Sequence, residues 1–210
     1  MELQEAIEGR RSIRRYTDDD VPNEDLIKIL RAAGLAPSAG NQQMWHFVVI
    51  KNRQLIERMK QAVLEAVDAM SQWPEAEAYQ SNIHALRTYA IFFANAPVVI
   101  AALAKPYLTP LDSELLPKHG LSFQEIHALR GDPGRQSLGA AIQNLVLAAH
   151  SLGYGTCWMT GPLFANPALR VLLDVKPEWQ LAAIIPLGRP AEKPNPRTRQ
   201  PVEEIYTLIE

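Results

Sequence analysis

The segment from Gln136 to Leu152 constrains the fold most, because as a helix it would be apolar on nearly every face. Leu, Ile, Val, Ala and Gly make up most of it, and Gln143 and Asn144 are the polar residues at its centre. A surface helix carries an apolar stripe, whereas a helix that is apolar all round is stable only when other elements cover it. We therefore predict that this segment is the buried core helix of the chain.

Other apolar runs predict strands. Aromatic and β-branched residues favour a strand over 45–50, and a run of six apolar residues after Pro97 favours a buried strand over 98–103. Two further strands are expected over 156–159 and 181–187, and helices over 2–9, 22–34, 53–72, 73–95 and from Asn166 onward. The helix over 22–34 carries an apolar stripe formed by Leu26, Ile27, Leu30 and Ala33. The combination predicts an α+β fold class.

The composition predicts a single domain over residues 1–210. Hydrophobic residues make up 47% of the chain, enough for a packed core without disulfide or metal support. A net charge of −2 argues against a nucleic-acid-binding or membrane-surface protein, which would be strongly basic. Cys157 is the single cysteine, which fits a reducing compartment, and the N-terminus lacks the apolar stretch of a secretory signal. We expect a cytoplasmic protein with no membrane or nucleic-acid partner.

Four arginines in six residues, Arg10, Arg11, Arg14 and Arg15, surround Ser12 near the start of the chain. Guanidinium groups bind phosphate through paired, charge-assisted hydrogen bonds, to which a hydroxyl adds another donor. The alternative is a solvated basic turn. Neither a dinucleotide-binding nor a P-loop glycine motif is present, so a bound phosphate would be held by arginines. The scattered histidines lack the spacing of a zinc site, and we expect no metal.

Three further segments are candidates for function. The loop over 37–43 is rich in amides that could hydrogen-bond a ligand, although its residues are also ordinary turn residues. The irregular segment over 104–135 has the length of a lid or binding segment. The proline-rich tail over 189–210 regains apolar residues at its end, as expected of an arm that packs on a partner subunit. For Cys157, Trp45 and Trp158 we expect packing roles, with Cys157 as a small buried residue of a strand.

Five groups of residues occur in an order that resembles the FMN-dependent nitroreductase superfamily. They are RRSIRRY over 10–16, APSAGNQQMWHF over 36–47, GAAIQNL over 139–145, LGYGTCW over 152–158, and GRP over 188–190 followed by RTR over 197–199. The resemblance implies a nitroreductase-like fold, in which helices flank a central, mostly antiparallel sheet. It also implies an intertwined homodimer with a C-terminal arm, and FMN pockets at the subunit interface to which both chains contribute.

The resemblance also assigns residues to the cofactor. Arg10, Ser12 and Arg199 correspond to phosphate and ribityl ligands, with Arg197 beside them and Arg11 within the same motif. Arg14 corresponds to the cation at the N1 and O2 edge of the flavin, where a positive charge stabilises the reduced, anionic form. The remaining positions are Pro37, Ser38, Ala39, Asn41 and Gln43 from the partner chain, and Thr160 and Gly161 near flavin N5. Met44 stands where the family usually has proline.

The function implied is an oxidoreductase in which FMN carries electrons from NADH or NADPH to a flat, electron-poor acceptor such as a nitroaromatic or a quinone. The catalytic chemistry would then take place on flavin N5, with no catalytic side chain required. Two alternatives stay open. One is a specialised member of the superfamily that dehalogenates, dehydrogenates or breaks down the flavin itself, and the other is a non-catalytic flavin-binding module.

Overall fold

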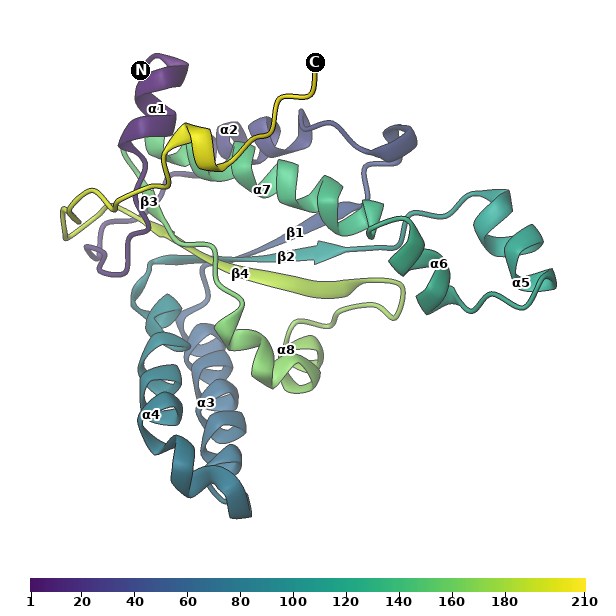
Figure 1. The fold of residues 1–210 in the computed structure, drawn as a ribbon. Helices are drawn as coiled ribbons and strands as arrows, with labels where there is room; N and C mark the ends of the chain where they lie inside the picture. Colours follow the sequence, from purple (N-terminus) through teal and green to yellow (C-terminus); the bar gives the residue numbers. More distant parts are fainter.

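The computed structural model describes residues 1–210 and is built around one antiparallel sheet (Figure 1). Its strands are β1 (Trp45–Ile50), β2 (Val98–Ala104), β3 (Gly155–Thr156) and β4 (Gln180–Gly188), in the spatial order β1-β2-β4-β3. Every neighbouring pair is antiparallel. Helices cover both faces of this sheet (Figure 1), and the predicted α+β fold class is confirmed.

Strand β2 is the centre of the core, because all seven of its residues are buried. Successive side chains of a strand point to opposite faces. Ile100 and Ala102 accordingly belong to the cluster formed with α2 (Asn23–Gly34) and α7 (Pro133–Ser151), whereas Val99 and Ala101 pack with α3 (Arg53–Met70) and α8 (Asn166–Leu172). Burial on both faces explains why this strand is a continuous apolar run.

Helix α7 is the buried helix that the sequence predicts, and it begins three residues earlier than expected. Asp132 accepts a hydrogen bond from the Arg135 amide and caps the helix, and Pro133 occupies its first turn, where a missing N–H is harmless. Ile142 and Leu145 are fully buried within the helix. It packs against α2, β2 and β3 and runs along one face of the sheet (Figure 1).

The remaining helices surround these elements. They are α1 (Leu3–Gly9), α4 (Gln80–Tyr89), α5 (Leu116–Lys118), α6 (Phe123–Leu129) and the short turns η1 (Ala39–Asn41), η2 (Pro74–Tyr79), η3 (Phe92–Asn95), η4 (Leu111–Leu115), η5 (Gly161–Ala165) and η6 (Val202–Glu204). The stripe predicted for α2 is partly wrong: Ile27 is 57% exposed, whereas Ile29 is fully buried. The buried face follows Leu26, Ile29 and Ala33, a spacing of three and four residues. No helix combines the length and apolar composition needed to cross a bilayer.

Two sequence expectations differ from the structure in other places. The segment over 104–135 is largely helical, and Ser122 and Glu125 form the capping box that starts α6, a signal the irregular composition hid. The strand expected over 156–159 ends at Thr156, and only Met159 returns to the sheet, by a bridge to Ile184. Cys157 is buried as predicted although it lies outside a strand, and Trp158 is 45% exposed rather than packed.

Candidate functional site

The arginine run lies in an extended segment held between β3 and the start of the C-terminal arm. The Ile13 amide donates to the Thr156 carbonyl at 2.9 Å, and the Ala191 amide donates to the Arg15 carbonyl at 2.9 Å. On the same side, the Thr17 amide donates to the carbonyl of Arg189 at 2.9 Å. The backbone is therefore paired on two sides and does not form the solvated turn that the sequence left open.

Two glycines allow this close pairing. A Cβ atom at Gly155 would lie 2.6 Å from Cγ1 of Ile13, and one at Gly188 would lie 3.2 Å from Cδ1 of Tyr16 and 2.6 Å from Cδ of Pro97. A Cβ atom at either position would overlap these neighbouring atoms, and a packed core leaves them little room to move. The glycines of the GYG and GRP motifs thus bring the arginine segment onto the edge of the sheet.

Residues alternate in direction along this extended segment, which separates the arginines into two groups. Ser12 and Arg14 lie near the thiol of Cys157, as does Arg10. Arg11 and Ile13 line a cavity on the opposite side, and the Arg11 guanidinium donates to the carbonyl of Glu8 at the end of α1 at 2.6 Å. Arg10, Ser12 and Arg14 are therefore the group that shares one face.

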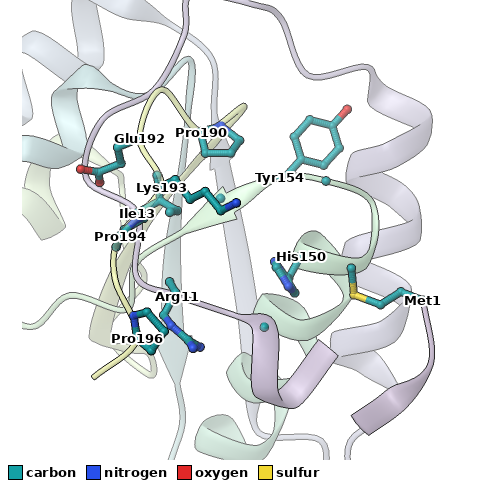
Figure 2. A pocket seen from close by; sticks show the side chains of 13 residues that line it. Met1, Arg11, Ile13, His150, Tyr154, Pro190, Glu192, Lys193, Pro194 and Pro196 are labelled. Carbon is teal, nitrogen blue, oxygen red and sulfur yellow. The ribbon is translucent and has the colours of Figure 1, made fainter. Parts of the chain in front are cut away.

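The cavity on the Arg11 side has a volume of about 410 Å³ and lies between α1, the end of α7 and the arm (Figure 2). His150, Tyr154, Glu192 and Lys193 are among its lining residues. Burial lowers the pKa of His150, and the charges of Arg10 and Arg11 lower it further. Both effects favour the neutral imidazole. Arg10, Ser12 and Arg14 do not line this cavity.

Positive charge is concentrated on the face of Arg10, Ser12 and Arg14, and the carboxylate of Glu192 lies near the same Cys157 thiol. Burial lowers the pKa of Arg10, and the neighbouring charges of Arg11 and Arg199 lower it further, which places the arm's Arg199 beside the segment. None of these arginines forms a salt bridge. Glu192 instead accepts hydrogen bonds from the backbone amides of Arg14 and Arg15. Guanidinium groups and a hydroxyl with no carboxylate partner fit the phosphate of FMN. Arg197 is exposed in the arm.

The loop over 37–43 is held in an uncommon backbone conformation. Gly40, Asn41 and Gln43 have φ values of 55°, 53° and 49°. Such left-handed residues, when they are not glycine, cost about 1–3 kcal/mol each and persist only where other contacts impose them. The Ser38 hydroxyl accepts a hydrogen bond from the Gln43 amide at 3.0 Å, and the buried Ser137 hydroxyl accepts one from the Ala39 amide at 3.3 Å. Pro37, the first residue of the loop, is exposed, and Met44, which follows the loop, is fully buried.

The loop and the arginine face lie at opposite ends of α7 (Figure 1). Ser137, which binds the loop, is in the first turns of the helix, whereas His150, whose ring lies 3.0 Å from where a Gly9 Cβ would be, is in the last. At 1.5 Å per residue, roughly 20 Å of helix separates the two positions. One chain therefore does not bring the two predicted groups of residues together.

Thr160 and Gly161 lie at the start of η5, beside a second cavity. Thr160 lines a space of about 390 Å³ together with Leu138, Trp158 and Arg135. Sequence reasoning assigned Trp158 to packing and did not identify Arg135 or Glu192. The signal for Trp158 was its place directly before Met159, because successive residues of an extended backbone face opposite ways and Met159 is buried against Ile184.

Cys157 should be an unreactive thiol. Burial raises its pKa above the ordinary value, and this outweighs the lowering effect of Arg14 and Ser12. Because the thiolate is the reactive form, we expect the native protein to react with a thiol-specific disulfide reagent far more slowly at mildly alkaline pH than the same protein unfolded in urea. Equal reaction rates for the two forms would contradict the burial argument.

Comparison with known proteins identifies the family of the chain. Residues 7–189 match the model of the nitroreductase family. The chain belongs to the nitroreductase family. The matched range contains the arginine segment, the 37–43 loop, α7 and the Thr160 turn, so the resemblance inferred from the motifs is confirmed.

Several known proteins are similar to this nitroreductase-family chain in sequence or in fold. A BluB-like flavoprotein from Clostridium difficile 630 is 34% identical with a TM-score of 0.84 over 100% of both chains. An NADH dehydrogenase from Thermus thermophilus is 28% identical over 93% of this chain and 90% of the relative. Iodotyrosine deiodinase from Nematostella vectensis is 28% identical over 99% of this chain and 75% of the relative. A deiodinase crystal structure with FMN and 3-iodo-L-tyrosine has a TM-score of 0.71 at 20% identity, with 96% of both chains covered.

Proposed function

We propose that the protein is an FMN-dependent oxidoreductase that takes electrons from NADH or NADPH and passes them to a flat, electron-poor acceptor. The face formed by Arg10, Ser12 and Arg14 with Arg199 beside it carries this proposal, because it is an unpaired cationic surface suited to one terminal phosphate. FMN, when bound, supplies the hydride chemistry. The names of the flavoprotein and NADH dehydrogenase relatives support this choice of cofactor and donor.

Specific residues would hold the cofactor. Arg10, Ser12 and Arg199 would bind its phosphate and ribityl oxygens, and Arg197 and Arg11 would add positive charge nearby. Arg14 is exposed, and its guanidinium donates to the Ser12 carbonyl at 3.3 Å and lies 5.8 Å from the Phe92 ring. From this position it would turn toward the pyrimidine edge of the flavin. A cation there favours the reduced form and raises the potential.

A homodimer completes this site. The 37–43 loop and Thr160 with Gly161 would border the flavin, but the loop lies roughly 20 Å of helix away from the arginines of its own chain. In a dimer with two-fold symmetry, the loop of one chain can reach the arginine face of the other. The arm over 189–210 supports the same arrangement, because Ile205, Tyr206 and Leu208 are 60–70% exposed.

The kinetic order of the reaction tests the proposed function. Neither the motifs nor the fold offers a second redox centre, so donor and acceptor have to use one site in turn. With NAD(P)H varied at several fixed concentrations of a quinone, we expect parallel double-reciprocal lines when the loss of reduced nicotinamide absorbance is followed. Intersecting lines would mean that both substrates are bound together. Heat release and chromatography of the cofactor should yield FMN, and recovery of FAD would reject the phosphate argument.

A second candidate is reductive dehalogenation of an aromatic ring, which the similarity to iodotyrosine deiodinase in sequence and fold favours. The exposed Trp158 beside the cavity at Thr160 offers a surface on which an aromatic substrate could stack. An acceptor screen with the FMN-loaded protein distinguishes the two. Release of halide from a halogenated phenol, in excess of turnover with quinones and nitroaromatics, would favour this candidate.

A further inference from the structure

A buried carboxylate organises the segment that follows β2. Asp112 is only 4% exposed. It accepts hydrogen bonds from both the amide of Thr109 at 2.8 Å and the hydroxyl of Thr109 at 2.6 Å. Buried carboxylates are uncommon unless they are paired, because an unpaired charge is costly to bury. The charge of Asp112 therefore requires specific partners.

The charge partner of Asp112 is Arg130, which comes from the end of α6. Its Nη1 atom lies 2.7 Å from each carboxylate oxygen of Asp112. The same guanidinium lies 4.7 Å from the centre of the Tyr107 ring, within range of a cation–π interaction. The Thr109 hydroxyl, and then Arg130, hold the pKa of Asp112 below its ordinary value, so the pair stays charged at neutral pH. Thr109, Asp112, Arg130 and Tyr107 are called the Asp112 clasp below.

The Asp112 clasp contacts the 37–43 loop through Tyr107, and its chain neighbours Leu108 and Lys105 add backbone contacts. Ring atoms Cε2 and Oη of Tyr107 lie 3.3 Å from the position that a Cβ atom would take at Gly40. The side-chain amide of Gln42 donates to the Leu108 carbonyl at 2.9 Å, and the amide of Lys105 donates to the Met44 carbonyl at 3.2 Å. Gly40 is itself left-handed, Gln42 lies between the left-handed residues Asn41 and Gln43, and Met44 follows them, so these contacts support a conformation that needs external support.

We propose that the Asp112 clasp is a positioning device that imposes the left-handed conformation of the 37–43 loop, and thereby sets the affinity for the flavin that this loop borders across the subunit interface. The part concerning flavin rests on the proposed function. It follows that the segment over 105–131 and the cofactor are energetically coupled. An acceptor that displaces this segment would weaken FMN binding. By linkage, bound FMN would oppose displacement of the segment by the same factor.

Hydrogen exchange and FMN titration of the full-length protein test this coupling. Asp112→Asn removes the charge of the clasp, and Thr109→Val removes a single donor with less risk to folding, whereas Thr109→Ser keeps the hydroxyl. Asp68→Asn is a matched control, because it breaks an Asp–Arg pair with Arg87 at 2.8 Å that joins α3 and α4 away from the loop. Exchange of the amides over 38–44 is measured without flavin, and the FMN dissociation constant is measured separately.

We expect Asp112→Asn and Thr109→Val to accelerate exchange over 38–44 and to raise the FMN dissociation constant about 5-fold or more, the lower limit of typical coupling between sites. Thr109→Ser and Asp68→Asn should leave both unchanged. Faster exchange confined to 109–131, with the loop and the affinity unaffected, would overturn the proposal. If the unaltered protein binds no FMN, the proposed function fails, and the exchange measurement alone then decides whether the clasp holds the loop.

Discussion

Ending the chain after Gly188 should abolish both dimerisation and FMN binding. This truncation removes Arg199, the apolar end of the arm and the backbone partners of residues 15 and 17 at positions 189 and 191. The arginine segment would then lose one of its two neighbours, and the exposed apolar side chains that we assign to the partner subunit would be absent. Light scattering measures the oligomeric state, and visible absorbance after FMN incubation and desalting measures retention of the cofactor.

A shorter truncation separates the two contributions of the arm. Ending the chain after Gln200 keeps Arg197, Arg199 and the pairing at 189–191, but removes Ile205, Tyr206 and Leu208. We expect this protein to have an unchanged far-ultraviolet circular dichroism spectrum and a dimer that dissociates at higher protein concentration than the full chain. A stable, flavin-bound monomer of either truncated form would show that the site needs no partner.

Replacing Arg199 with Ala should weaken FMN binding by about 10- to 150-fold. A charge-assisted hydrogen bond contributes about 1.5–3 kcal/mol, which corresponds to that range in the dissociation constant. Arg58, an exposed arginine of α3, gives the matched control, because Arg58→Ala removes the same charge elsewhere and should leave the affinity unchanged. Fluorescence titration with FMN measures both variants.

Arg14→Ala should act differently from Arg199→Ala, although both remove a guanidinium from the same region. Arg14 is assigned to the flavin ring and not to the phosphate, so its loss should mainly lower the reduction potential of bound FMN. Equal effects of the two substitutions on affinity, with the potential unchanged, would show that the two roles are wrongly assigned. The potential is measured by equilibration with a dye of known potential during anaerobic reduction.

The sequence alone predicted the elements whose pattern is local. It predicted α7 from an apolar composition on all faces and β2 from an uninterrupted apolar run, and the order of its motifs indicated the family. These signals can be recognised in the sequence because a continuous apolar run or a motif consists of neighbouring positions, whatever the rest of the chain does. The sequence failed where burial depends on a neighbour from elsewhere in the chain, as for Ile27 and Trp158.

Tertiary structure decided how the candidate residues are distributed. The extended backbone at residues 10–16, imposed by pairing with Thr156 and the arm, places Arg10, Ser12 and Arg14 on one face and Arg11 on the other. The packing of α7 places the 37–43 loop at the opposite end of this helix from that face. Arg130 reaches Asp112 across eighteen positions of irregular sequence. Distances of this kind arise from long-range packing of elements, and no local period in a sequence encodes them.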